Sequence, residues 1–404
     1  MATQTALNAN DIAQLGFVAL ENFLKNKPID QVASERPLLK ALMAKKKPWG
    51  GGNQNIVEQI RTDYDSNFEW FGDTTGGTVN RSSAVTYNTR DTVKQASYPW
   101  NSAHDGFQFS EDFLLGNGIL INDSQSPRNS SAAGLVQLTN VFNEAMEVLR
   151  LGFEKILDQS LHLSGAVAIT TGTGTGSLAN KAINGLDFLV NFDPRTGNVG
   201  GINRATAGNE YWRNNWDTGS GLNTHGTTSP TGYAHADLLT AMHDMWRKCQ
   251  RNGGTPNFIL AGTDFIKGYE LAATASTALS RYAVQPGTSS APWNLDPSLE
   301  IKEGGTFTGL YFQGVPIMWD PVFEDIDAIT GSTPSNGTSV LWSKRCYMLN
   351  LNHLSLRPIQ DNDMIARKPP REHTSYNYYW GMTWRGSLTA NRMNCHGCIM
   401  ASGA

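Results

Sequence analysis

One helical pattern of unusual length constrains the fold of this chain more than any other feature. Apolar residues recur at spacings of three and four from Leu135 to Leu161, which is the spacing that lines one face of an α-helix. The pattern predicts a helix over about 130–162, and about 32 residues at a rise of 1.5 Å make a rod of roughly 48 Å. Helices in globular proteins average about 11–12 residues. We therefore expect this helix to span the whole molecule.

The first 50 residues contain two short amphipathic helices and no core of their own. The first helix has Ile12, Leu15 and Phe23 on its apolar face, and the second is expected around 38–43. A glycine- and proline-containing breaker follows at 48–52. Such a segment must dock on another surface, so we expect it to act as an arm.

The next segment, from Asn55 to about Phe109, has the character of strands. β-Prone stretches at 56–60 and 85–98 flank a polar middle that contains glycines at 72, 76 and 77. The pattern predicts a long two-stranded hairpin. An isolated hairpin is only marginally stable in water, so we expect this one to lie on a neighbour.

The region after the long helix mixes helices and strands. Helices are predicted near 238–249 and 264–279, with strands at 258–260, 307–311 and 315–319. Alternating and aromatic-rich strands return from 347 to 388. Together with the long helix, these elements predict an α+β fold.

The composition excludes several classes of protein. Charged residues make up 17% of the chain, against about 25% in globular proteins, so much of the surface is either uncharged and polar or covered by partners. The net charge of −4 argues against a dedicated nucleic-acid binder. No apolar run approaches the roughly 18 residues of a membrane span, and the N-terminus has no secretory pattern. We expect a soluble protein made in a reducing cytoplasm.

The sequence offers few candidates for chemistry. Cys395 and Cys398 form a CxxC pair, but a structural zinc site needs four ligands and the chain has no second CxxC or HxxxH. We interpret this stretch as the last strand, with its cysteines acting as small hydrophobic residues. The glycine-rich loop at 172–177 has Ser177 where a dinucleotide-binding loop has its third glycine. We expect no enzymatic activity, no cofactor and no metal.

The run Lys45–Lys47 could touch nucleic acid. A run of three lysines is more often a solvated helix end, which is the interpretation we favour.

Four stretches suggest a family. They are INGLD at 183–187, GGINR at 200–204 followed by YWR at 211–213, the returning segment at 347–357, and the closing strands from 380 to 397. These stretches and the order of arm, hairpin, long helix, α/β region and returning strands resemble the major capsid protein of tailed bacteriophages. That family has the Hong Kong 97 capsid fold.

The resemblance implies a domain plan and a function. Hexamers and pentamers of one chain would self-assemble into the icosahedral shell that encloses the phage double-stranded DNA, and the protein would reside in the virion after assembly in the host cytoplasm. The implied parts are an N-terminal arm (1–50), an extended β-hairpin loop (51–112), a peripheral domain with the spine helix (113–182 plus 345–404), and an α/β axial domain (183–344).

The resemblance also implies partners. The N-terminal region of about 50 residues leaves no room for a long fused scaffolding segment, so we expect a separate scaffolding protein or none. A portal and a decoration or cement protein are further expected partners. Some family members cross-link their subunits through a lysine–asparagine isopeptide bond, but Lys94 is the only lysine of this loop and lies away from its expected tip near 72–78. We expect no cross-linking.

Apolar and aromatic residues of the arm and the loop are the candidates for contacts between subunits. Local packing within the hairpin is the competing interpretation of the aromatic ones. The candidates are Ile12, Leu15, Phe23, Tyr64, Phe68, Trp70, Phe71, Tyr98 and Trp100.

Three other functions remain open at this point. An encapsulin-like compartment shell would share the capsid fold. A glycan-binding protein would suit the 11 Trp and 12 Tyr, although that class usually shows many evenly spaced strands. A nucleotide-dependent enzyme would rest on the glycines at 172–177 alone.

Overall fold

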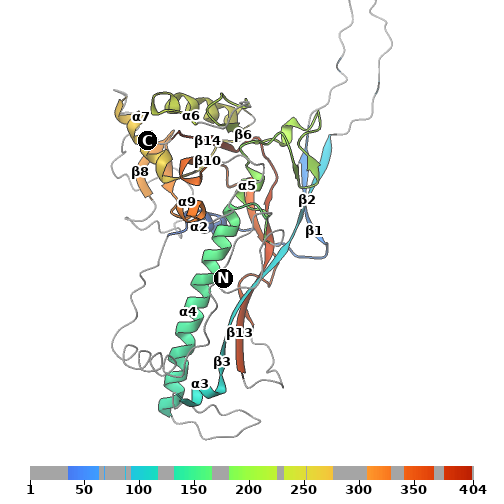
Figure 1. Ribbon diagram of the computed structural model, residues 1–404. Helices are drawn as coiled ribbons and strands as arrows, with labels where there is room; N and C mark the ends of the chain where they lie inside the picture. Colours follow the sequence, from blue (N-terminus) through green and yellow to red (C-terminus); the bar gives the residue numbers. More distant parts are fainter. Residues whose placement is uncertain are drawn as a thin grey trace, which may run out of the picture.

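Figure 1 shows the computed structural model of the chain. It describes residues 35–62, 68, 87, 92–116, 132–165, 182–224, 232–251, 253–275, 307–328, 341–367 and 377–402. The helix expected from the apolar pattern around Ile12 and Phe23 lies outside these residues.

The predicted long helix is present as α4 (Ala132–His162), which has 31 residues. It runs through the lower half of the molecule in Figure 1 and ends beneath the upper layers. Leu149, Phe153, Leu157 and Leu161 recur every fourth residue and are all buried. The spacing that predicted the helix is therefore also the spacing that attaches it to the core.

A four-stranded sheet lies beside α4. Strand β13 (Asn377–Ala390) pairs with all the other strands of this sheet. Its pairing with β3 (Asn101–Ser110) extends over ten residues, from Asn377↔Ser110 to Gly386↔Asn101. On its other side β13 pairs with β11 (Leu354–Pro358) and β12 (Ile365–Arg367). The short helix α3 (Glu111–Gly116) follows β3 directly.

Aromatic rings join this sheet to the helix. Trp380 of β13 meets Phe142 of α4 edge-on at 5.0 Å between ring centroids and stacks on Phe107 of β3 at 5.8 Å. Figure 1 shows the three elements side by side along the lower part of the molecule.

A six-stranded mixed sheet forms the upper part of the molecule. Its strand order is β6-β14-β10-β7-β9-β8, in which β14–β6 and β7–β9 are parallel pairs and the other pairs are antiparallel. The strands are β6 (Asn215–Asp217), β14 (Gly397–Met400), β10 (Arg345–Leu349), β7 (Phe258–Ala261), β9 (Val315–Trp319) and β8 (Phe307–Phe312).

Both faces of this sheet are covered. Helices α6 (His235–Gln250) and α7 (Thr263–Ala275) pack on one face through a cluster that includes Met242, Phe265 and Ile259. The helices α2 (Pro37–Ala44), α5 (Leu186–Leu189) and α9 (Val322–Ala328) and the end of α4 belong to the cluster on the other face. Strands β7, β10 and β14 are consequently buried at every position.

The C-terminal segment, expected to belong to the peripheral domain alone, contributes strands to both sheets. Strands β10 and β14 belong to the C-terminal segment assigned to the peripheral domain, yet they pair with β7 and β6 in the six-stranded sheet. Strands β11 and β13, from the same segment, pair with β3 beside the spine helix. The C-terminal segment therefore serves both sheets, because hydrogen-bond pairing and not chain order decides where a strand lies.

A smaller group of elements lies at one side of the molecule. The hairpin strands β1 (Asn55–Arg61) and β2 (Val93–Pro99) pair with each other, and β4 (Asn198–Val199) pairs with β5 (Ile202–Asn203). Two single turns of 3-10 helix complete the described elements, η1 (Glu210–Trp212) and η2 (Trp342–Lys344). None of the helices in the described part of the chain combines the length and apolar character needed to cross a bilayer.

Candidate assembly surfaces

The base of the β1–β2 hairpin is attached to its own subunit through one face. Ile56, Ile60, Ala96 and Tyr98 point to that face and are buried, and Ile56 lies opposite Tyr98 in the register. The Tyr98 hydroxyl donates a hydrogen bond to the carbonyl oxygen of Ala390, 2.8 Å away. Burial raises the pKa of Tyr98 well above its ordinary value, against a smaller lowering effect of this hydrogen bond. The hydroxyl therefore stays protonated.

This geometry corrects the expectation for Tyr98. Only 2% of the residue is exposed, so its subunit already covers it and little surface is left for a neighbour to contact. Tyr98 is a core residue that fastens the hairpin to β13.

Polar contacts hold the same base in place. Glu58 forms an ion pair with Arg357 of β11 and accepts a hydrogen bond from the Thr389 hydroxyl at 3.3 Å. Lys94 donates to the side-chain oxygen of Asn209 at 3.2 Å and lies over the Tyr211 ring. The hairpin is thus fixed on two sides, by the four-stranded sheet and by the segment around 198–213.

Gly200 explains part of the GGINR stretch. Its φ angle is +61°, and a Cβ atom there would lie 2.9 Å from the Cβ atom of Ala96. The Ser97 amide donates to the Gly200 carbonyl oxygen at 2.8 Å. Glycine is required because the turn is left-handed and because β2 passes directly against it.

Arg204 and Arg213 of the same stretches build the platform behind the turn. Arg204 is buried and donates to the carbonyl oxygen of Leu189 at 2.6 Å. Arg213 in turn donates to the carbonyl oxygen of Arg204 from two guanidinium nitrogens. Both arginines thus bind backbone carbonyl oxygens.

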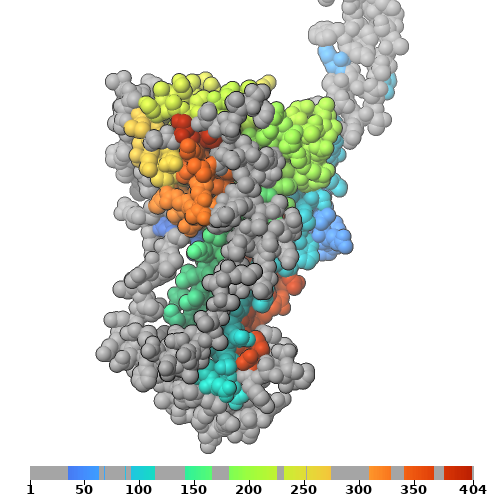
Figure 2. Space-filling view, viewed as in Figure 1, coloured from blue at the N-terminus to red at the C-terminus, as the bar shows by residue number. Residues whose placement is uncertain are grey.

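Exposed apolar side chains occur on the outer face of the hairpin base and elsewhere in the same excursion. Seven large hydrophobic residues are exposed in the described part of the chain, and four of them belong to this excursion: Val57 (39%), Phe68 (69%), Tyr87 (88%) and Val93 (56%). In Figure 2 the blue and cyan atoms of β1 and β2 lie at the edge of the molecule beside the light green segment. Apolar side chains gathered on a surface mark sites of protein association.

The structure places the other predicted contact residues as follows. Phe68 is largely exposed, and Trp100 is partly buried against the core. Sequence reasoning missed Val57, Tyr87 and Val93; the alternation along β1, in which 56 and 60 face inward, is the signal that would have selected Val57. The candidates that lie outside the described residues are Ile12, Leu15, Phe23, Tyr64, Trp70 and Phe71.

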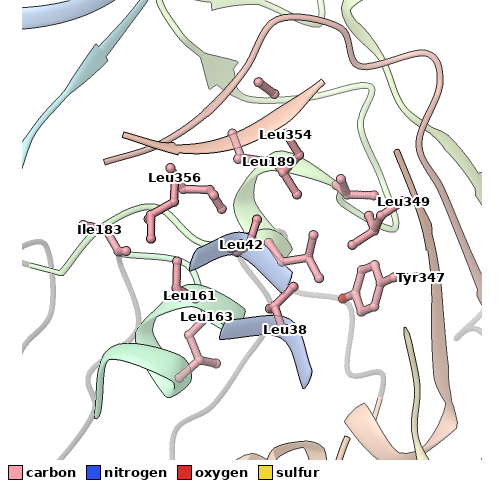
Figure 3. Packing of buried hydrophobic residues seen from close by; sticks show 14 of the residues in the cluster. Leu38, Leu42, Leu161, Leu163, Ile183, Leu189, Tyr347, Leu349, Leu354 and Leu356 are labelled. Carbon is pink, nitrogen blue, oxygen red and sulfur yellow. The ribbon is translucent and has the colours of Figure 1, made fainter. Parts of the chain in front are cut away.

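Helix α2 fastens the described start of the chain to the centre of the molecule. Figure 3 shows Leu38 and Leu42 between Leu161 and Leu163 at the end of α4, Leu189 of α5, and Leu354 and Leu356 of β11. Leu38 and Leu42 are almost completely buried. The predicted short helix at 38–43 is confirmed, and it belongs to the main core.

The chain after α2 continues along the edge of β11. The Trp49 amide donates to the carbonyl oxygen of Pro358 at 2.8 Å, and the Trp49 carbonyl accepts from the Gln360 amide at 2.8 Å. Lys45 donates to Asn352 at 3.2 Å, and Lys46 pairs with Asp363. Two of the three lysines thus contact their own chain, which weakens the nucleic-acid interpretation of this run.

Two buried ion pairs flank Trp342 at the end of the spine helix. His162 Nε2 lies 2.7 Å from Asp320 Oδ2, and Arg345 Nη1 lies 3.0 Å from Asp187 Oδ1. The Arg345 guanidinium also lies 3.9 Å from the centroid of the Trp342 ring. Burial alone would lower the pKa of His162, but the carboxylates of Asp320 and Asp158 outweigh it and raise this pKa to about 9.

The cysteines are buried and unbridged. Burial raises the pKa of Cys249 and of Cys395 to about 12, so both remain thiols at neutral pH. Among the residues that the structure describes, no three His, Cys, Asp or Glu side chains group in a way that could hold a metal ion. Cys398 lies in β14, where all four residues are buried, so the strand interpretation is confirmed there. It is wrong for Cys395, which lies in the turn that precedes the strand.

Similarity to known proteins lies in the structure and not in the sequence. No family model matches the chain, and no curated protein matches it significantly. The solved capsid chain of cyanophage A-1(L) superimposes with a TM-score of 0.52 at 17% identity, covering 94% of this chain and 97% of that one. The capsid chain of Myoviridae phage XM1 and a chain of Gordonia phage Cozz give TM-scores of 0.46 and 0.42, at 11% and 13% identity. They cover 94% and 100% of this chain, and 98% of their own lengths.

The cyanophage chain has the same overall fold as this chain, because the TM-score exceeds 0.5 and the superposition extends over nearly the whole of both chains. The chain therefore has the Hong Kong 97-type fold of phage capsid proteins.

Proposed function

We propose that this chain is a major capsid protein, which self-assembles as hexamers and pentamers into the icosahedral shell of a phage head. The observation that carries the proposal is the hairpin: its base is fixed to the subunit, while Val57 and Val93 are exposed on the opposite face of the paired strands. Phe68 and Tyr87 are exposed in the same excursion. Exposed apolar residues of this kind are suited to burial under a neighbouring subunit, which a shell would provide. The likeness in fold to the cyanophage capsid chain supports the same role.

The contacts between subunits would be many and individually modest. Specific protein interfaces bury on the order of 1,000 Å² or more, and a closed shell multiplies such contacts, so that avidity stabilises the assembly. We assign these contacts to the arm, with Ile12, Leu15 and Phe23, and to the loop, with Tyr64, Phe68, Trp70, Phe71 and Trp100. Val57, Tyr87 and Val93 join this set on the strength of their exposure.

The division of labour along the chain follows from this role. Residues 1–50 would be the arm and 51–112 the extended loop, and the spine helix with the four-stranded sheet would form the peripheral domain. The six-stranded sheet, which includes β10 and β14, would form the axial domain. Scaffolding, portal and decoration proteins are the expected partners, assembly would take place in the host cytoplasm, and the enclosed DNA would be held without sequence-specific contacts.

The solved structures that the chain resembles support a structural role for it. The fold is that of shell proteins, and neither an encapsulin-like shell nor a glycan-binding protein is favoured by the solved structures that the chain resembles.

The test is direct observation of assembly. Negative-stain microscopy of the purified recombinant chain, combined with sedimentation velocity, is expected to show closed shells or capsomer-sized rings. If the chain stays a 44.1 kDa monomer even when its scaffolding partner is supplied, the proposal is wrong.

Covalent cross-linking of the shell is not expected. Lys94 is the only lysine of the 51–112 segment, and its Nζ atom is engaged with Asn209 and Tyr211 of its own subunit. Denaturing the assembled shell should release single chains by intact mass. A ladder of covalent oligomers would contradict this expectation.

A further inference from the structure

The carboxyl group of Asp158 is buried at the junction of α4 and α2. The residue is completely covered, and neither of its oxygens receives a hydrogen bond from the described residues. The backbone N–H of Leu39, in the first turn of α2, points toward it without reaching hydrogen-bond geometry. An acceptor in this position costs free energy unless a donor reaches it or it takes up a proton.

Arg36 is an incompletely used donor beside it. This residue precedes α2 and provides no side-chain cap for the helix. Its Nη1 atom lies 3.6 Å from Glu154 Oε2, whereas its Nε atom is buried without an acceptor. The guanidinium is close enough to Asp158 to lower the pKa of that carboxyl.

Glu154 and Asp158 are neighbours on α4. They are four residues apart, so their side chains stand on the same face one turn from each other. Glu154 is one-quarter exposed and also lies 3.5 Å from Arg150 Nε, whereas Asp158 is covered. Arg36 therefore has one carboxylate at the surface and a second in the interior within one helical turn.

We propose that Arg36 is a two-position latch at the start of α2, bound to Glu154 while Asp158 is protonated and to Asp158 when that carboxyl ionises. In the second position, the Arg36 Nε donor, which now has no acceptor among the described residues, would bind the Asp158 carboxylate oxygens, which have no donor among them. The latch sets how the chain enters α2, and α2 is the element that joins the N-terminal end of the described chain to the spine helix.

The charges around Asp158 place this exchange near neutral pH. The groups that face it are His162 of α4, Asp320 from the loop after β9, Arg36 from the start of α2, and the Leu39 amide. Burial raises the pKa of Asp158 to about 7, His162 and Arg36 lower it, and Asp320 adds to the increase. The carboxyl thus changes its charge between pH 6 and 8.5, while His162, with a pKa of about 9, stays largely protonated.

Double-mutant cycles on the full chain test the latch. Urea unfolding at pH 6 and pH 8.5 would be measured for Arg36→Gln, Glu154→Gln, Asp158→Asn and the two double variants that contain Arg36→Gln. We expect Arg36 and Asp158 to be uncoupled at pH 6 and coupled at least about threefold in the unfolding equilibrium constant at pH 8.5. The coupling of Arg36 with Glu154 should show the reverse dependence on pH.

Arg150→Gln is the matched control, because Arg150 contacts Glu154 from the exposed side. Its coupling with Asp158 should be absent at both pH values. A coupling between Arg36 and Asp158 that is the same at pH 6 and pH 8.5, or absent at pH 8.5, would overturn the proposal. If a variant does not fold, cryo-electron microscopy of the wild-type protein at the two pH values decides the matter, because the Arg36 side chain must change its carboxylate partner.

Discussion

At the scale of single residues, buried charge is concentrated at the end of the spine helix. Arg345 is completely buried and pairs with Asp187. Its guanidinium also lies on the Trp342 ring and donates a hydrogen bond to the Tyr347 hydroxyl oxygen at 3.1 Å. A buried ion pair contributes little more to the free energy of unfolding than a well-packed apolar pair would. Removal of one partner, however, leaves the other charge buried and uncompensated.

The substitution Asp187→Ala is therefore expected to lower the free energy of unfolding by about 3 kcal/mol or more. Asp193→Ala is the matched control, because its partner Arg195 is more than one-third exposed and pairs of that kind contribute about 1 kcal/mol or less. Urea unfolding of the full chain measures both. Equal losses in the two variants would show that burial of the Arg345 pair has no energetic consequence.

His162 makes stability depend on pH in the alkaline range. Its pKa is raised from an ordinary value near 6.5 to about 9, so the folded chain binds more protons than the unfolded chain between these values. The stabilisation is complete below about pH 6.5 and is lost as the pH rises through about 9, a change of about 3 kcal/mol. In unfolding titrations His162→Gln should flatten this decline, and an unchanged slope in that variant would contradict the assignment.

In the acid range two buried groups change stability in opposite directions. Burial lowers the pKa of His396 to about 3, so its contribution to stability falls as the pH drops below about 6.5. Asp158, with its raised pKa, contributes in the opposite direction as the pH drops from about 7 toward 4. The two effects overlap and oppose each other.

At the scale of elements, local pattern predicted the type of an element better than its partners. The apolar spacing predicted α4, and the pattern around Leu38 predicted α2, because these signals repeat within a few residues. The described part of the second β-prone stretch begins as β2 at Val93, whereas most of its predicted start at 85–91 lies outside the described residues.

Burial was harder to predict than secondary structure at the hairpin. An aromatic residue in a predicted loop looked like a contact residue, yet the hydroxyl of Tyr98 bonds to Ala390, which is 292 residues away in the sequence. No local pattern contains that information. Gly200 was noticed only as part of a resemblance, although its positive φ angle and its approach to Ala96 give it a physical reason.

The two faces of the hairpin are expected to serve different purposes, one in attachment to the subunit and the other in assembly. Val57 and Val93 are exposed, while the opposite face holds the hairpin to its subunit. The double substitution Val57→Asp and Val93→Asp should leave the free energy of unfolding within roughly 0.5 kcal/mol per site and strongly reduce the yield of closed shells seen by microscopy. Val148→Asp, on an exposed residue of α4, is the matched control; equal assembly defects in both variants would show that the hairpin face has no special role.

At the scale of the whole molecule, the first 27 residues of the proposed arm contribute nothing to the described core. The described core begins at α2, so deletion of residues 1–27 removes none of the buried residues shown in Figure 3. The truncated chain should fold, with a circular dichroism spectrum and unfolding midpoint near those of the full chain, and should fail to form complete shells. Normal closed shells from the truncated chain would show that these residues are not essential for assembly.

The position of β14 has a consequence for synthesis. This strand lies between β6 and β10, and it leaves the ribosome long after β6, because the two are separated by most of the second half of the chain. At about 5–20 residues per second the delay is roughly 10–40 s. Until β14 is made, the edge strand β6 therefore has no partner in this sheet, although β10, β7, β9 and β8 can already pair with one another. Late addition of one strand thus fixes the order in which the sheet can be completed, because β6 gains its partner only after β7, β8, β9 and β10 have been made.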